Sequence, residues 1–271
     1  AVAGAAVFLP TALAALLPSC GGSPDPDRLW STASRLLIER ADRLRPFLAS
    51  PPQTNEVARS CALMPGMLEI ARATGLPLRP REIGSSAGLN QFWDHYAYKL
   101  DDKGWNEGNS ALTLECKWRG NPAPLHVRPI VASRAGCDIN PLDLRQAEVR
   151  LRLQAYVWPD QAQRMANLRA AIGIALAHDV RVEKIAASRF AARELAARPE
   201  DKCIVIYHSI VRQYFPEDEG RAFDTAIAEA GAAATPQRPV AWLRLEQPKP
   251  PEPYELLLTL WPKGDTRVLA L

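Results

Sequence analysis

The sequence predicts an α/β fold: a doubly wound sheet with an antiparallel edge, preceded by a helical N-terminal region. Three observations support this prediction. Apolar residues recur at helical spacing between 27 and 74, and a strand pattern at 76–83 then leads into a glycine-rich turn. Beyond that turn, strand and helix patterns alternate, and the chain finishes in consecutive strands. We therefore expect a helical region over 1–78 and an α/β domain over 79–271.

The helical region contains two predicted helices. The first covers 27–50, begins after Asp25-Pro26 and is stopped by two prolines at 51–52. The second follows residue 56, is expected to kink at Pro65, and ends at Gly75, a residue typical of a helix C-cap.

The α/β domain begins with the strand that ends at residue 83. An inserted hairpin is expected near 111–133, from strand patterns at 112–118 and 125–133, with 97–110 as a loop. The apolar run at 203–207 is typical of a central parallel strand that is buried on both faces. The remaining predicted helices are 160–177, 190–197 and 217–230, and the remaining strands are 181–185, 240–245, 255–261 and 266–271.

Composition excludes several classes of function. The 271 residues carry 33 basic and 30 acidic side chains, spread evenly, so we expect no nucleic-acid partner. The five cysteines form no CxxC pair and no two of the four histidines lie four residues apart, which argues against zinc and against a disulfide framework. We expect no metal, and reduced thiols in a cytoplasmic protein.

An apolar stretch covers residues 1–20 and ends at a cysteine, as in an exported lipoprotein. It carries no basic residue before Arg28, and Pro10 and Pro18 interrupt it. It is also too short to span a bilayer. We therefore expect a helical segment there and no membrane partner.

The strongest motif is the turn Glu82-x-Gly84-x-Ser86-x-Gly88-x-Asn90. Small residues at alternate positions let the backbone turn sharply and approach a ligand. The following helix would offer free N–H groups. The acid before the first glycine suits a ligand with an ammonium group, such as the amino-acid end of S-adenosylmethionine. An ordinary tight turn of small residues is the plain alternative.

The same letters also satisfy G-x-S-x-G, the nucleophile elbow of serine hydrolases, with Ser86 as nucleophile and His208 as base. Hydrolases place several strands before this elbow, whereas helices are predicted here. This alternative is therefore the less favoured one.

Asp138 follows the next predicted strand and is placed to accept hydrogen bonds from a ribose diol, with Ile139 beside it. It lies about 50 residues after Gly88, and the inserted hairpin accounts for the long separation. A turn or cap role for Asp138 is an equal alternative.

Further candidates lie in three polar segments. His208 and Ser209 end the central strand, where ligands bind in open α/β sheets, and His208 is a candidate general base. Glu56 is the other catalytic candidate. The expected substrate residues are Asn55, Glu56, Arg59, Trp158, Asp160, Gln161 and Arg164.

Taken together, the motifs resemble those of the bacterial family DUF2332. The resemblance rests on QTNEVARSCALMPGML (53–68), EIGSSAGLN (82–90), GCDINPLD (136–143), YVWPDQAQR (156–164), IYHSIVRQYF (206–215), AWLRLE (241–246) and LTLWP (258–262). It implies a Rossmann-like fold of the S-adenosylmethionine-dependent methyltransferase type, without an established activity. Ser188 departs from the acid expected to hold an adenine amino group.

The leading hypothesis is methyl transfer from S-adenosylmethionine to a small molecule. The cofactor would contact Glu82, Gly84, Ser86, Gly88, Asn90, Asp138, Ile139, His208 and Ser209. A non-catalytic binder of a nucleotide-like ligand is the second hypothesis, and the serine hydrolase is the third. The sequence does not predict an oligomeric state.

Overall fold

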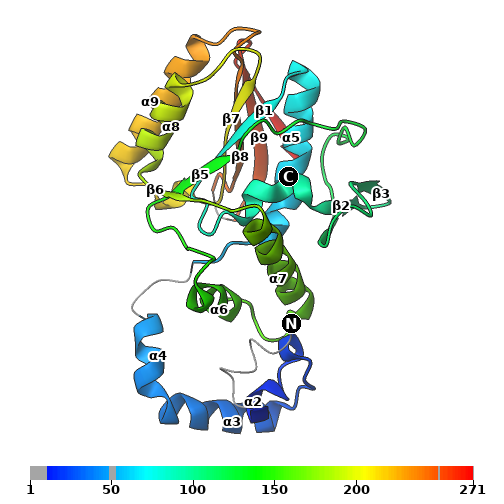
Figure 1. Cartoon of the computed structure of the whole chain (residues 1–271), viewed down its shortest axis with the longest axis vertical. Helices are drawn as coiled ribbons and strands as arrows, with labels where there is room; N and C mark the ends of the chain where they lie inside the picture. The colour runs from blue at the N-terminus through cyan, green and yellow to red at the C-terminus, as the bar shows by residue number, and fades with distance from the viewer. Residues whose placement is uncertain (1–10, 49–52, 250, 271) are drawn as a thin grey trace. The chain divides into compact units, whose positions relative to one another are not determined.

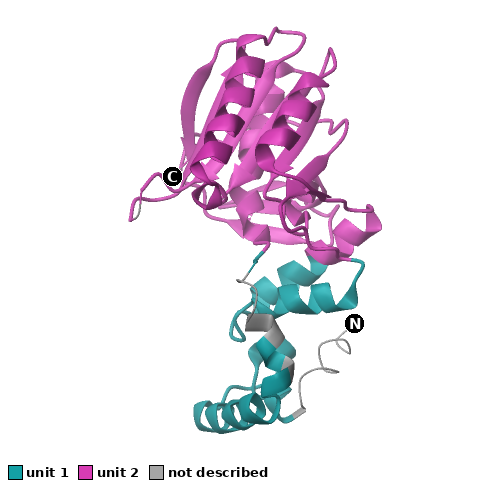
Figure 2. Ribbon diagram, turned by 90° about the vertical axis from the view of Figure 1, so that its left-hand side faces the viewer, with its two compact units in different colours: residues 1–54, 145–170 teal, residues 55–144, 171–271 magenta. Residues whose placement is uncertain are grey.

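The structure is a computed structural model, and it describes residues 11–48, 53–249 and 251–270. The chain divides into two compact units, which we describe separately (Figure 2). Unit 1 contains residues 1–54 and 145–170, and unit 2 contains residues 55–144 and 171–271.

Unit 1 is helical in its described part. The helix expected over 27–50 is two helices, α3 (Pro26–Glu39) and α4 (Ala41–Leu48), and residues 49 and 50 lie outside the described part. The Asp25 side chain accepts the Arg28 N–H at 3.2 Å and caps α3, and Pro26 follows at the first turn. The other elements are α2 (Thr11–Ala14), η1 (Pro18–Cys20), α6 (Ala147–Ala155) and the first part of α7 (Ala162–Ala177).

Unit 2 is built on a seven-stranded sheet with the order β10-β9-β8-β7-β1-β5-β6. The five strands from β6 to β8 are parallel, and β9 and β10 are antiparallel to their neighbours. The predicted α/β class and mostly parallel sheet with an antiparallel edge are therefore confirmed. The strands are β1 (Leu78–Ile83), β5 (Ala135–Asp138), β6 (Glu183–Lys184), β7 (Cys203–Ser209), β8 (Val240–Glu246), β9 (Glu255–Trp261) and β10 (Asp265–Ala270).

Helices cover both faces of this sheet (Figure 1). On one face, α5 (Ser60–Thr74) packs against β8 and β9, and it continues through Pro65 to the predicted cap at Gly75, where φ is +67°. On the other face, α8 (Ala187–Ala196) and α9 (Glu217–Ala232) pack against each other and on the sheet. Every residue of β7 is buried, as its apolar run predicts.

A second, three-stranded sheet differs from the predicted hairpin. Its order is β3-β2-β4, with strands β2 (Ala97–Leu100), β3 (Lys103–Trp105) and β4 (Thr113–Cys116). The hairpin joins β2 to β3, because Asp101 adopts a left-handed φ of +52° and turns the chain within two residues. The strand expected over 125–133 is absent apart from an isolated bridge at Val131. Pro129 removes a backbone donor within this segment, and Pro124 removes one just before it.

One disulfide corrects the prediction of reduced thiols. Cys61 of α5 and Cys116 of β4 are bonded, with Cα atoms 5.6 Å apart. The two cysteines are 55 residues apart in sequence, so no local sequence motif indicates that they pair. Disulfides are rare in cytosolic proteins. The cytoplasmic location therefore stays a prediction without support from reduced cysteines.

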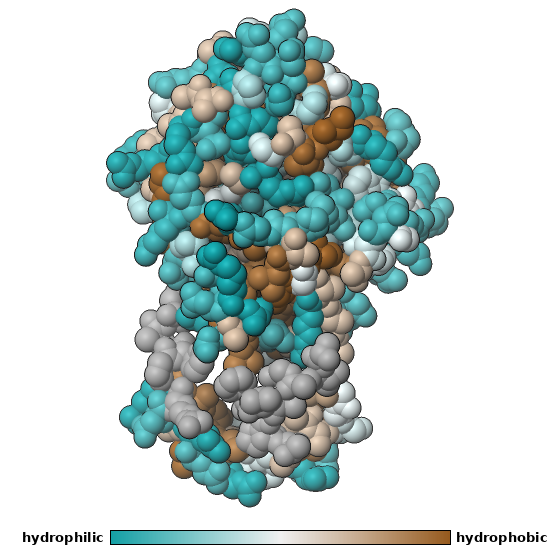
Figure 3. All heavy atoms as spheres, in the orientation of Figure 1, coloured by the Kyte–Doolittle hydropathy of each residue, from teal (hydrophilic) through white to brown (hydrophobic). Residues whose placement is uncertain are grey.

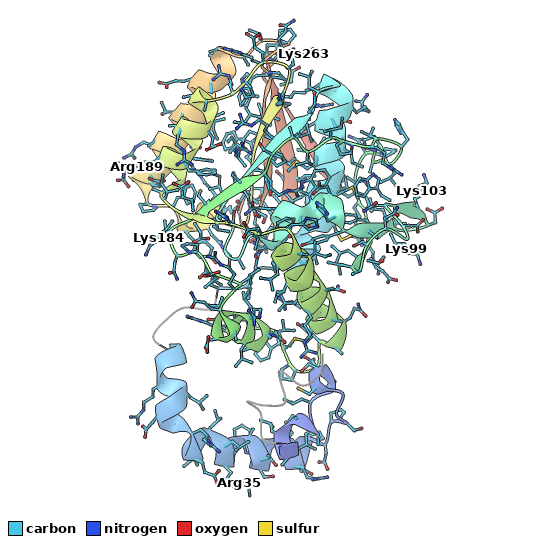
Figure 4. All side chains as sticks on the ribbon, in the orientation of Figure 1. Arg35, Lys99, Lys103, Lys184, Arg189 and Lys263 are labelled. Atoms are coloured by element: carbon cyan, nitrogen blue, oxygen red, sulfur yellow. A yellow bond between two sulfur atoms is a disulfide. The ribbon has the colours of Figure 1, made fainter. Side chains whose placement is uncertain are left out.

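The surface of unit 2 is mostly hydrophilic on the face seen in Figure 3. The basic residues labelled in Figure 4 come from separate elements, with Lys99 and Lys103 on the small sheet, Lys184 on β6 and Arg189 on α8. None of the helices in the described residues is long and apolar enough to cross a membrane.

Candidate functional site

The glycine turn follows β1 and requires its glycines. Gly84, Ser86 and Gly88 all have left-handed φ values, of +68°, +54° and +77°. A Cβ on Gly84 would lie 2.4 Å from the Cγ2 atom of Val211. A Cβ on Gly88 would lie 2.7 Å from Gln91 and from Val180. Backbone conformation and close approach therefore both exclude larger residues at the two glycines.

The N–H groups of this turn are bound within the protein. Asn55 accepts hydrogen bonds from Ala87 at 3.2 Å and Leu89 at 3.0 Å through one oxygen. Asp138 Oδ2 accepts the Ser86 N–H at 2.8 Å. The turn therefore does not present a ring of free donors to a phosphate.

Two predicted ligand residues hold the turn in place. Asn55 lies just before η2 (Val57–Arg59) and is buried beneath the turn. Asn90 accepts the Ser60 hydroxyl at 2.7 Å and donates to the Glu56 carbonyl at 3.2 Å. Both are positioning residues that join the start of α5 to the glycine turn.

Glu82 is the most unusual side chain at this edge of the sheet. It is 3% exposed, and its Oε2 atom has no hydrogen-bond partner among the described residues. Burial raises the pKa of this carboxyl to about 8, although Ser85 and Arg59 act to lower it. A buried polar group without a partner is costly and marks a candidate binding site. The Ser86 hydroxyl is a second buried atom without a partner in the described part.

Arg59 supplies the positive charge beside Glu82. Its guanidinium donates to the Ser209 carbonyl at 2.8 Å and lies 3.4 Å from the Ser209 hydroxyl. Burial lowers the pKa of Arg59, whereas the nearby carboxyl groups of Glu56, Glu246 and Glu82 act to raise it. Three carboxyl groups thus lie within electrostatic reach of one guanidinium.

His208 lies on the opposite face of the sheet from Glu82. Side chains alternate along a strand, and His208 shares the face of Ile206 in the core beneath α8 and α9. Its Nδ1 atom is 2.6 Å from Glu246 Oε1, and its Nε2 atom accepts the Trp242 N–H at 3.1 Å. Both ring nitrogens are engaged and the side chain is 1% exposed, so His208 is not available as a general base.

Glu246 is a site residue that the sequence reasoning missed. It ends β8, and Oε1 accepts hydrogen bonds from His208 and from the backbone of Val211 and Arg212. Burial acts to raise the pKa of Glu246, and these hydrogen bonds outweigh burial and lower it. The sequence could have suggested Glu246, because it is an acidic residue at the carboxyl end of a predicted strand, where ligand sites lie in parallel sheets.

Asp138 lies where it was predicted, at the carboxyl end of β5, and it is half-buried. Its two oxygens accept the N–H groups of Ser86 and Asn140, both at 2.8 Å. A carboxylate has about four acceptor positions, so a ribose diol and this capping role are compatible. The adjacent Ile139 is 76% exposed.

The remaining candidate residues lie in other parts of the chain. Trp158, Asp160, Gln161 and Arg164 belong to unit 1, where Trp158 is 69% exposed and Arg164 donates to Gln161 at 2.8 Å. Ser188 is in unit 2 and is bound by Glu219 through its N–H and its hydroxyl, at 2.7 and 2.9 Å.

Residues 7–271 match the family described as an uncharacterized protein conserved in bacteria, DUF2332. The chain belongs to the DUF2332 family. The match covers both units and every predicted site residue. No curated protein and no solved structure matches the chain. Within the described residues, no group of three or more His, Cys, Asp or Glu side chains is arranged to hold a metal ion, and the expectation of no metal stays a prediction.

Proposed function

We propose that this DUF2332 chain binds S-adenosylmethionine at the carboxyl ends of β1 and β7 and transfers its methyl group to a small molecule. The observation that carries the proposal is the buried Glu82 carboxyl, whose Oε2 atom has no partner among the described residues. Glu82 is near the end of β1, and the order of the strands reverses between β1 and β7: β5 and β6 lie beyond β1, whereas β8 lies beyond β7. Open α/β sheets bind ligands at such a reversal point.

The residues around Glu82 fit the chemistry of this cofactor. Glu82 would accept the ammonium group of the amino-acid end, and Asp138 would accept the ribose hydroxyls. Arg59 would face the carboxylate of the same amino-acid end. The bound cofactor would supply an electrophilic methyl group. Such a transfer depends mainly on positioning, so no dedicated base is needed on this chain.

The serine hydrolase is less well supported. Ser86 has a left-handed φ and an unpartnered hydroxyl, as a strained nucleophile would. However, His208, the histidine that would activate Ser86, donates a hydrogen bond to Glu246 and accepts one from Trp242. It also lies on the face of the sheet that α8 and α9 cover. His208 is therefore not placed to activate the serine hydroxyl.

Calorimetric titration with S-adenosylmethionine and S-adenosylhomocysteine tests the proposal. Both carry the ammonium group, whereas 5′-methylthioadenosine lacks the amino-acid end and serves as the matched control ligand. We expect the first two to bind, and methylthioadenosine to bind roughly tenfold to 100-fold more weakly, as expected for a charged hydrogen bond worth 1.5–3 kcal/mol. If none of the three binds, the proposal is wrong.

Turnover separates an enzyme from a binder. Incubation with S-adenosylmethionine and a pool of small-molecule acceptors is expected to release S-adenosylhomocysteine. Tight binding without release from any pool would favour the non-catalytic binder. Labelling of Ser86 by a fluorophosphonate would favour the hydrolase, and S86A is its control.

A further inference from the structure

A pocket lies beside β5 and β6, and two of its lining residues, Gln91 and Val180, also adjoin Gly88 of the glycine turn. It has a volume of about 690 Å³, within the range of small-molecule sites, and its lining comes entirely from unit 2. Its walls come from η3 (Leu89–His95), the first half of β5, residues 178–183 and α8. None of the predicted site residues lines it.

The shortness of the edge strand β6 explains why a pocket forms here. β6 has only two residues and pairs only with Cys137 and Asp138 of β5. Ala135 and Gly136 therefore pair with β1 alone among the described residues, and their outer side faces the pocket. In Figure 4, Lys184 marks β6 beside this edge.

The acids around the pocket are neutralised. Asp94 binds Arg134 in a bidentate pair, at 2.6 and 2.9 Å. Asp179 binds Arg181 at 2.6 Å, and Glu183 is bound by an arginine of α8 at 2.7 Å. A cationic ligand would therefore find no unpaired carboxyl group among the described residues of this pocket, in contrast to the site at Glu82.

Hydrogen-bond donors remain available to an anion. Arg181 uses its Nε and Nη2 groups on Asp179, and its side chain is 79% exposed. Its Nη1 group has no partner among the residues that the structure describes. The imidazole of the exposed His178 lies at the same wall.

Aromatic rings form the inner surface of the pocket. The His95 and His178 ring centroids are 4.1 Å apart, and Phe92 stacks on His178 at 5.8 Å with an interplanar angle of 27°. Arg134 lies over the Phe92 ring at 5.0 Å and donates to His95 Nε2 at 3.3 Å. Burial lowers the pKa of His95, which favours the neutral form of its ring.

We propose that this pocket binds a small planar aromatic carboxylate, with its ring against the exposed His178 and its carboxylate on Arg181. Aromatic faces favour a flat ring, and a guanidinium matches the geometry of a carboxylate. The lining of this pocket contains none of the residues predicted to bind S-adenosylmethionine, and the proposal does not rest on the function proposed for the Glu82 site.

The test is a titration of the full chain with 2-naphthoate, followed by NMR of the imidazole groups. The chain has only four histidines, so His95 and His178 report on the pocket while His126 and His208 serve as internal controls. We expect saturable shifts at the first two alone. The neutral 2-naphthylmethanol is expected to bind about tenfold or more weakly, because it cannot form the charged hydrogen bonds.

Two variants complete the test. R181Q is expected to weaken the binding of naphthoate about tenfold. The side chain is 79% exposed, so the substitution should leave the fold intact. R189Q, on α8 but outside the lining, is the matched control and should bind as the wild type does. The proposal is overturned if His95 and His178 show no saturable shift, if the alcohol binds as well as the acid, or if R181Q binds normally.

Discussion

Replacing Glu82 by glutamine should change how the stability of the protein depends on pH. Glutamine keeps the size of the neutral carboxyl and removes its titration. The carboxyl is 3% exposed, and burial raises its pKa from a usual 4.5 to about 8. Between these two values the unfolded chain loses this proton while the folded chain keeps it.

The size of the effect follows from linkage. The stabilisation that Glu82 contributes as a neutral group is complete below pH 4.5 and is lost as the pH rises towards 8. The loss is about 1.4 kcal/mol for each pH unit in this window, so wild type should lose about 4 kcal/mol relative to E82Q between pH 5 and pH 8.

The assay is urea unfolding of wild type and E82Q across that range of pH. The difference between their free energies of unfolding should fall steadily as the pH rises. A difference that is constant from pH 5 to pH 8 would refute a neutral, buried Glu82. E252Q, at an exposed glutamate, is the control, and its free energy of unfolding should depend on pH as that of wild type does.

Three further predictions concern the glycine turn and the disulfide. G84A should lower the free energy of unfolding by roughly 2–4 kcal/mol, because it adds left-handed strain and a clash with Val211, and V211A should restore part of the loss. N55A should cost roughly 1–3 kcal/mol, because two buried N–H groups of the turn lose their acceptor. The double variant C61S/C116S should be about 2–4 kcal/mol less stable than wild type without reductant.

Each of these has a control measured by the same urea unfolding. G108A tests left-handed strain alone, because a Cβ there meets no neighbour within 4 Å. N109A removes an exposed asparagine and should change stability by less than about 0.5 kcal/mol. With dithiothreitol, wild type should lose its advantage over C61S/C116S. An unchanged difference would show that the disulfide is not the cause.

The sheet was predictable because its signals are local. The apolar run of β7, the strand–glycine turn of β1 and the three closing strands each carry their pattern within a few residues. The predicted position of the hairpin was wrong, because the turn is made at Asp101. Nothing in the sequence marks this polar residue as one that adopts a left-handed conformation.

The site was predictable only in part, for a reason of geometry. Sequence spacing marked Glu82 and Asp138 at the ends of strands, but it could not show that His208 faces the opposite side of the sheet. The roles of Asn55 and Glu246 depend on contacts between segments 32 or more residues apart. Such long-range pairings leave no periodic signal in the chain.

The central claim is that the buried Glu82 carboxyl anchors a cationic cofactor, and the proton balance of binding tests it most directly. Titration of S-adenosylmethionine at pH 7 in buffers of different ionisation enthalpy counts the protons released. In the protein without ligand, the pKa of Glu82 is about 8, so the carboxyl group carries a proton at pH 7. Binding of the ammonium group should displace about one proton, whereas E82Q should bind S-adenosylmethionine weakly and release none. Equal affinity and equal proton release in wild type and E82Q would contradict the account.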